Sequence, residues 1–114
     1  GGITGVKKIS DFADVYNVRT APHGAPDLSP ICFAAHMHLN LSTHNFGIQE
    51  FVGFGNEQSK EIFKHDMKLE NGMIIVSDAP GLGIEFDEQA AAKYSYKRSY
   101  LPISRLEDGT LWHW

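Results

Sequence analysis

The sequence predicts an α/β fold, and three observations support this prediction. Helical periodicity over residues 4–17 and 30–41 alternates with short β-capable runs at 18–21 and 46–51. That alternation is typical of a parallel sheet covered by helices. The chain has 114 residues, of which 42% are hydrophobic and 21% charged, and this is the composition of one ordinary globular domain. Turn and cap residues separate the run 18–21 from the helix 30–41.

The predicted elements up to residue 51 follow one another closely. In 4–17 the apolar residues recur at three- and four-residue spacing, which predicts an amphipathic helix; they are Val6, Ile9, Phe12, Ala13 and Tyr16. The strand 18–21 ends in Pro22-His23-Gly24. Asp27 or Ser29 can cap the helix 30–41, and Pro30 suits its first turn. These segments form a βαβ unit.

The pattern changes after residue 51. We expect a short helix at 59–65, a β-rich run at 72–77, a turn at 79–84 and a helix at 88–94 capped by Asp87. The tail is aromatic and is expected to pack as an extended segment over another surface; its residues are Tyr94, Tyr96, Tyr100, Trp112 and Trp114.

Charge and cysteine content exclude several classes of partner. The net charge of -4 and pI near 5.8 argue against a nucleic acid or an anionic membrane. No apolar run approaches the roughly 18 residues of a membrane span. The single cysteine, Cys32, allows no intrachain disulfide, so we expect a reducing, cytoplasmic location.

Three polar residues lie where the predicted strands end. His23 sits between a rigid proline and a permissive glycine, which favours a site over a cleft, although a loop histidine bonded to backbone is equally compatible. Glu50 ends a strand expected to be buried on both faces, so its carboxyl must be paired, hydrogen-bonded or protonated. Asp27 can serve simply as a helix cap.

The histidines His36, His38 and His44 do not predict a metal site. Residues i and i+2 lie on nearly opposite sides of a helix, and the remaining ligands of a common zinc motif are missing from the sequence.

The predicted sheet is incomplete, because two parallel strands alone leave their outer edges unpaired. The sequence also opens on Gly1-Gly2 without a methionine. We expect this chain to fold only with further strands from the same protein.

Four segments in order resemble the C-terminal quarter of enolase-superfamily enzymes of the mannonate dehydratase group, some of which are called starvation-sensing proteins. They are GGIT at 1–4, APHGAPDLSP at 21–30, FGIQEF at 46–51 and DAPGLGIEFDE at 78–88. The resemblance implies the C-terminal portion of a (β/α)7β TIM-like barrel. Residues 1–52 would form helix 6, strand 7, helix 7 and strand 8, and 53–114 would return to the capping domain.

The resemblance also implies a reaction. Enzymes of this group are Mg2+-dependent hydro-lyases that convert D-mannonate to 2-keto-3-deoxy-D-gluconate and water, by removing the proton next to the carboxylate and expelling the 3-hydroxyl. The alternative is a family member of low or no activity that acts on gluconate or in starvation regulation. We expect a homo-oligomer with a small sugar acid as its ligand, and an inactive 114-residue piece.

The site residues implied by the resemblance are few. His23 and Glu50 would be catalytic and bind substrate, and Asp27 would bind substrate. Ala25 would be the specificity position, and Trp112 or Trp114 would line the pocket. Glu50 need not be the base, because a carboxyl kept neutral can donate a hydrogen bond to the enediolate. The metal ligands and the proton-transferring residues of the group lie on earlier strands, so we expect no metal ligand in this chain.

Overall fold

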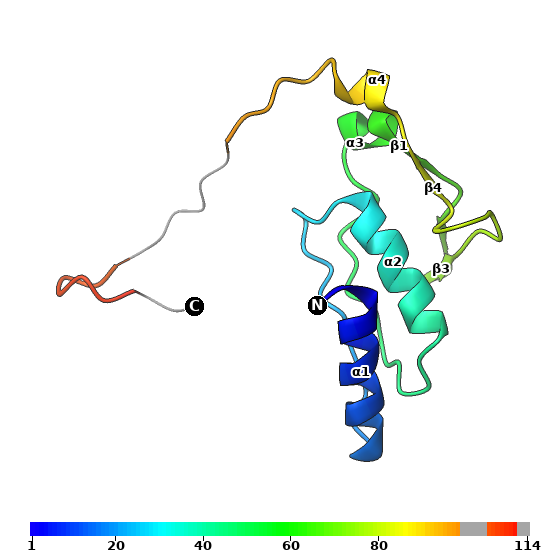
Figure 1. The fold of residues 1–114 in the computed structure, drawn as a ribbon, viewed down its shortest axis with the longest axis vertical. Coiled ribbons are helices and arrows are strands. Elements are labelled where there is room, and N and C mark those ends of the chain that lie inside the picture. The colour runs from blue at the N-terminus through cyan, green and yellow to red at the C-terminus, as the bar shows by residue number, and fades with distance from the viewer. Residues whose placement is uncertain (99–104, 112–114) are drawn as a thin grey trace.

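The computed structural model describes residues 1–98 and 105–111, and it contains both helices and strands (Figure 1). The helices are α1 (Gly2–Val15), α2 (Pro30–Leu41), α3 (Glu57–Ile62) and α4 (Glu88–Ala91), and the strands are β1 (Phe63–His65), β2 (Lys68–Glu70), β3 (Met73–Ile75) and β4 (Ile84–Phe86). In Figure 1, α2 lies at the centre, between α1 and the group formed by α3, α4, β1 and β4.

Helix α2 has the predicted bounds, and its cap is now identified. The Ser29 side chain accepts a hydrogen bond from the Cys32 amide at 3.3 Å, and Pro30 occupies the first helical turn. Ser29 accepts from an amide that has no partner within the helix. The N-cap of α2 is therefore Ser29 and not Asp27. Helix α1 ends two residues earlier than predicted, before Asn17, whose φ is 55°.

The segments 18–21 and 46–51 pair in parallel, as predicted, but neither forms a regular strand. One bridge joins Thr20 to Phe46. The Thr20 amide donates to the Asn45 carbonyl at 2.9 Å, and the Gly47 amide donates to the Thr20 carbonyl at 2.8 Å. Within the described residues no third strand lies beside this pair, so the ladder has no neighbour to extend it.

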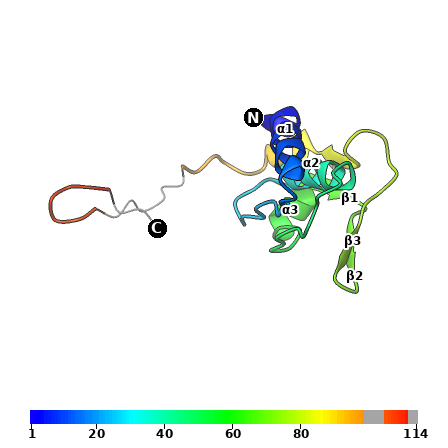
Figure 2. The ribbon, with the colours of Figure 1, turned by 90° about the horizontal axis from the view of Figure 1, so that it is seen from below.

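Beyond residue 51 the strands are antiparallel and short. The prediction of a helix over 59–65 is wrong at its end, because α3 stops at Ile62 and β1 pairs instead with β4. Strands β2 and β3 form a hairpin around Asn71-Gly72, where both residues have positive φ, as a two-residue hairpin turn requires. Figure 2 shows this hairpin projecting from the helices. Helix α4 is shorter than predicted, but Asp87 does cap it, accepting from the Ala90 amide at 2.9 Å.

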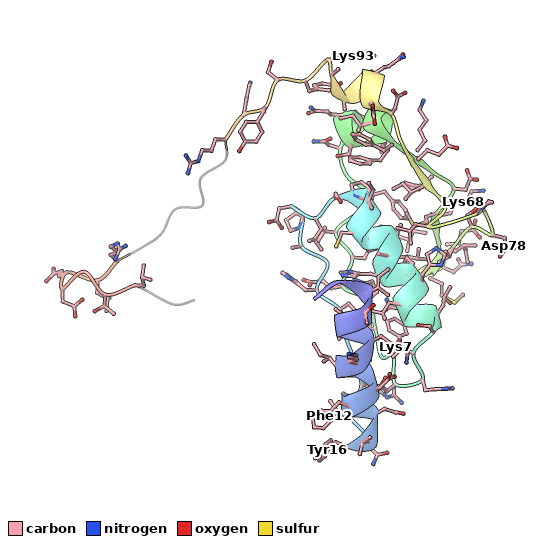
Figure 3. The ribbon with its side chains drawn as sticks, in the orientation of Figure 1. Lys7, Phe12, Tyr16, Lys68, Asp78 and Lys93 are labelled. Atoms are coloured by element: carbon pink, nitrogen blue, oxygen red, sulfur yellow. The ribbon has the colours of Figure 1, made fainter. Side chains whose placement is uncertain are left out.

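The core is small and centred on α2. Its buried residues are Phe33, Ala34, Met37 and Met67. The apolar face predicted for α1 is largely uncovered, since Ile9 and Phe12 are each 66% exposed, whereas Ser10 is buried. Helix α1 packs with its Ser10 side inward, and the Ser10 carbonyl accepts from Asn45 Nδ2 at 2.9 Å. Phe12 and Tyr16 lie at the end of α1 far from α3 and α4 (Figure 3).

Tyr96 is 89% exposed within this chain, and the packing of the aromatic tail over another surface stays a prediction. Tyr94 is held at one point, where its hydroxyl donates to Glu61 Oε2 at 2.6 Å. Tyr100, Trp112 and Trp114 lie outside the described residues. None of the helices found in 1–98 and 105–111 has the length and apolar character needed to cross a membrane.

Candidate active site

His23 and Glu50 lie side by side, although 27 positions separate them in the sequence. The His23 Nε2 and Glu50 Oε2 atoms are 3.6 Å apart. The parallel pairing of the segments around Thr20 and Phe46 brings both residues to the same end of the pair. At this distance the two groups attract each other when the imidazole is protonated, and both can face a third molecule.

Gly24 fixes the approach of these two segments. Its amide donates to Glu50 Oε2 at 3.0 Å. A Cβ built on Gly24 would lie 1.9 Å from the carbonyl oxygen of Glu50 and 2.6 Å from its carbonyl carbon. Gly24 is not among the glycines with positive φ. The position therefore requires glycine for space and not, as the sequence pattern suggested, for conformational freedom.

Within the described part of the chain, Glu50 is not buried on both faces. Its side chain is 56% exposed and that of His23 is 77% exposed. The burial prediction assumed covered faces, but the described part of the chain covers neither face of the 46–51 segment completely. The carboxyl is nevertheless paired and hydrogen-bonded, by His23 and the Gly24 amide.

Gln49 and Asn40 were not predicted as site residues, yet they hold this arrangement together. Gln49 Nε2 donates to the Pro22 carbonyl at 3.2 Å and to the Glu50 carbonyl at 2.8 Å. Asn40 Nδ2 donates to Gln49 Oε1 at 2.8 Å, and Asn40 is buried on α2. The sequence signal for Asn40 is a polar amide between Leu39 and Leu41.

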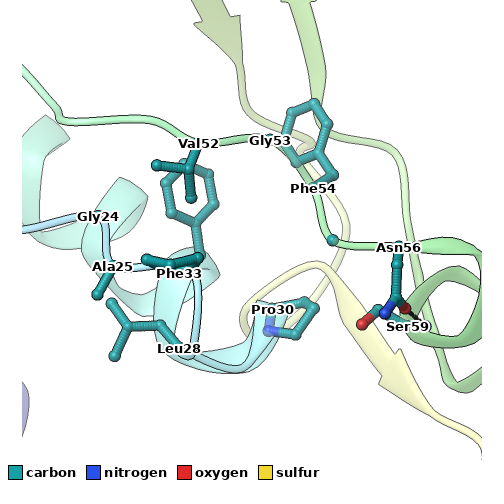
Figure 4. Close-up of a pocket in the computed structure, with 12 residues that line it drawn as sticks. Gly24, Ala25, Leu28, Pro30, Phe33, Val52, Gly53, Phe54, Asn56 and Ser59 are labelled. Atoms are coloured by element: carbon teal, nitrogen blue, oxygen red, sulfur yellow. Dashed lines mark hydrogen bonds between the residues drawn. The ribbon is translucent and has the colours of Figure 1, made fainter.

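Asp27 and Ala25 lie on the turn that follows His23. Asp27 is exposed, and the turn is closed by the Leu28 amide donating to the Ala25 carbonyl at 3.1 Å. Ala25 faces a cavity of about 380 Å3 (Figure 4). The cavity lies between the 24–30 turn and residues 52–59, and Phe33 and Phe54 form apolar parts of its wall. A substituent at residue 25 would change the shape of this cavity.

The part of the chain that the structure describes does not group side chains that could hold a magnesium ion. Within 1–98 and 105–111, no three His, Cys, Asp or Glu side chains are grouped closely enough to hold a metal ion. Burial lowers the pKa of His36, and its Nε2 lies 3.9 Å from Cys32 Sγ. Trp112 and Trp114, the tryptophans predicted for the pocket, are outside the residues that the structure describes.

The fold and the matching sequence define the class of protein. Residues 1–90 match the family described as enolase C-terminal domain-like, and this chain belongs to that family. Its α/β fold is that of the corresponding part of enolase-superfamily barrel enzymes, as a solved structure shows. A crystal structure of an enolase from Pantoea ananatis, with bound D-gluconate and magnesium, superimposes with a TM-score of 0.86 and 42% identity over 98% of this chain and 27% of that chain.

Curated relatives carry the names of sugar-acid dehydratases. A D-galactonate dehydratase family member from Oceanicola granulosus is 53% identical over 98% of this chain. A D-mannonate dehydratase from Caulobacter sp. (strain K31) is 50% identical over 100% of this chain. The chain spans 28% of the length of each of these relatives.

Proposed function

We propose that this chain supplies the sugar-acid-binding edge of a hydro-lyase that converts D-mannonate to 2-keto-3-deoxy-D-gluconate and water. The observation that carries the proposal is the apposition of His23 and Glu50, 3.6 Å apart at one end of a parallel pair of segments. In α/β barrels that end of the strands carries the chemistry. The names of the Caulobacter and Oceanicola relatives support the choice of a sugar-acid dehydratase.

The proposed roles follow from the donors and acceptors available. The Gly24 amide orients one oxygen of the Glu50 carboxyl, which leaves the other oxygen for the ligand. In its neutral form that carboxyl can donate a hydrogen bond to the enediolate that develops after proton removal. The exposed imidazole of His23 can bond a sugar hydroxyl as donor or acceptor. Asp27 would accept from another hydroxyl, and Ala25 would set the space beside it.

We place the magnesium ion of the proposed enzyme on residues outside this chain. In the mannonate dehydratase group that the sequence resembles, the metal ligands lie on earlier strands; within 1–98 and 105–111, no three suitable side chains are grouped. The steps assigned to His23, Asp27 and Glu50 are therefore substrate binding and hydrogen bonding, and none of them passes through the metal. The cytoplasmic location and the homo-oligomer stay predictions.

A second candidate function is that of a family member with low or no turnover that binds gluconate or acts in starvation regulation. The Pantoea ananatis structure, which holds D-gluconate and magnesium, favours this candidate. The same hydrogen-bonding groups would serve either sugar acid, because D-mannonate and D-gluconate differ in the configuration of one hydroxyl.

One assay distinguishes the two candidates. The complete protein that carries this chain is incubated with Mg2+ and either D-mannonate or D-gluconate, and the 2-keto acid product is measured over time. A chelated sample serves as the control for the metal requirement. Rapid product formation from D-mannonate supports the dehydratase. No product from D-mannonate over many hours, with binding of D-gluconate, would support the second candidate.

A further inference from the structure

The Gln49 side chain joins both segments of the candidate site to helix α2. Its Nε2 donates to the carbonyl of Pro22, the residue before His23, at 3.2 Å. The same nitrogen donates to the carbonyl of Glu50 at 2.8 Å. Both hydrogens of the amide are thereby directed to backbone that immediately adjoins a site residue.

Asn40 determines which way the Gln49 amide faces. Asn40 Nδ2 donates to Gln49 Oε1 at 2.8 Å, so the Gln49 oxygen faces α2 and its nitrogen faces the loops. Asn40 is buried, and α2 is fixed by the core residues Phe33, Ala34 and Met37. A group held by a packed helix is held more firmly than a group on a loop.

Two direct hydrogen bonds also link residues 22–24 to Glu50. The Glu50 amide donates to the Pro22 carbonyl at 3.3 Å, at the long end of the normal range. The Gly24 bond ends on the Glu50 side chain, which is itself more than half exposed. The Gln49 amide, which is held from α2, therefore adds a further link to these contacts in the alignment of His23 with Glu50.

We infer that Gln49 and Asn40 are positioning residues, which set the spacing of His23 and Glu50 without touching the substrate. This inference rests on the proposed function for its activity readout. Because small displacements of catalytic groups reduce rates strongly, loss of either amide should lower kcat by roughly tenfold or more. KM should change much less than kcat, since the substrate contacts themselves remain.

The test uses the complete protein with the isosteric variant Asn40→Asp and the length-matched variant Gln49→Met. In Asn40→Asp the carboxylate can only accept, so the Gln49 amide must turn over and direct its oxygen at the Pro22 carbonyl. The matched control is Asn45→Asp. Asn45 Nδ2 donates to the carbonyls of Ser10 and Val18 at 2.9 and 2.8 Å, away from residues 22–24 and 49–50. We expect Asn45→Asp to lower Tm and to leave kcat within about twofold.

A second readout does not depend on activity. Amide hydrogen exchange of peptides covering 22–26 should become roughly tenfold faster in Asn40→Asp and Gln49→Met. The reason is that the Glu50 carboxyl, which accepts from the Gly24 amide, is no longer fixed in position. In Asn45→Asp the faster exchange should be confined to residues 18–20. If the wild-type protein forms no 2-keto acid, the proposed function fails and exchange alone decides the inference. Exchange over 22–26 that matches the wild type in both variants would overturn it, as would an unchanged kcat in an active protein.

Discussion

The Gly24 amide donates to Glu50 Oε2 at 3.0 Å, and a Cβ on residue 24 would lie 1.9 Å from the Glu50 carbonyl oxygen. Both relations reflect the close approach of Gly24 to Glu50, the first to its side chain and the second to its backbone. Because a carbonyl oxygen cannot move aside as a flexible side chain can, any larger residue at position 24 must separate the segments that carry His23 and Glu50.

Gly24→Ala is therefore expected to cost about 1–3 kcal/mol of stability, as overpacking does, and to lower kcat of the complete protein. Thermal unfolding and the 2-keto acid assay measure both effects. The matched control is Gly5→Ala, since a Cβ on Gly5 in α1 meets nothing within 4 Å. That control should gain roughly 0.5–1 kcal/mol through helix propensity and keep its activity. If the Gly24→Ala protein has wild-type stability, the segments that carry His23 and Glu50 can move apart without a cost in free energy, and this prediction is wrong.

His23→Asn tests the proposed substrate contact of the imidazole. His23 is 77% exposed and lies 3.6 Å from Glu50, so the substitution should not disturb the fold. We expect a higher KM for D-mannonate together with a lower kcat, because a contact made in both the ground state and the transition state is lost. Steady-state kinetics on the complete protein decide the matter, and wild-type values of both constants would refute the contact.

The isolated 114-residue chain should not unfold cooperatively. Few of the described apolar residues are buried, and most of those lie on α2. On α1, Ile9, Phe12 and Val15 remain 66%, 66% and 76% exposed. So little burial leaves the entropy cost of folding largely uncompensated. Scanning calorimetry of the isolated chain should show no sharp transition, whereas a single cooperative peak would contradict the expectation that further strands are needed.

Some of the structure could be predicted from the sequence because the signals were local. Helix α2 combined an apolar period, Pro30 in its first turn and a serine before it, and its bounds were predicted correctly. The Asp87 cap was predicted for the same kind of reason. The parallel approach of 18–21 and 46–51 followed from the alternation of elements, and it is confirmed by the Thr20–Phe46 bridge.

Other features depend on partners that local sequence does not specify. The burial of Glu50 was predicted from its place in a strand of a parallel sheet, and the apolar face of α1 was predicted from periodicity. Exposure, however, is decided by which surfaces lie opposite. Three-residue strands such as β1 and β4 are too short to show a period. The link from Asn40 to Gln49 joins a helix to a neighbouring segment, and neither residue type predicts its partner.

The most direct test of the account is the turnover of Glu50→Gln in the complete protein. The amide oxygen of glutamine can still accept from the Gly24 amide, so the fold should be kept and circular dichroism should match the wild type. Loss of a donor of matched acidity to the developing enediolate should lower kcat for D-mannonate by roughly 100-fold or more. If kcat is unchanged while the wild type is active, Glu50 has only a structural role and the account of this site is wrong.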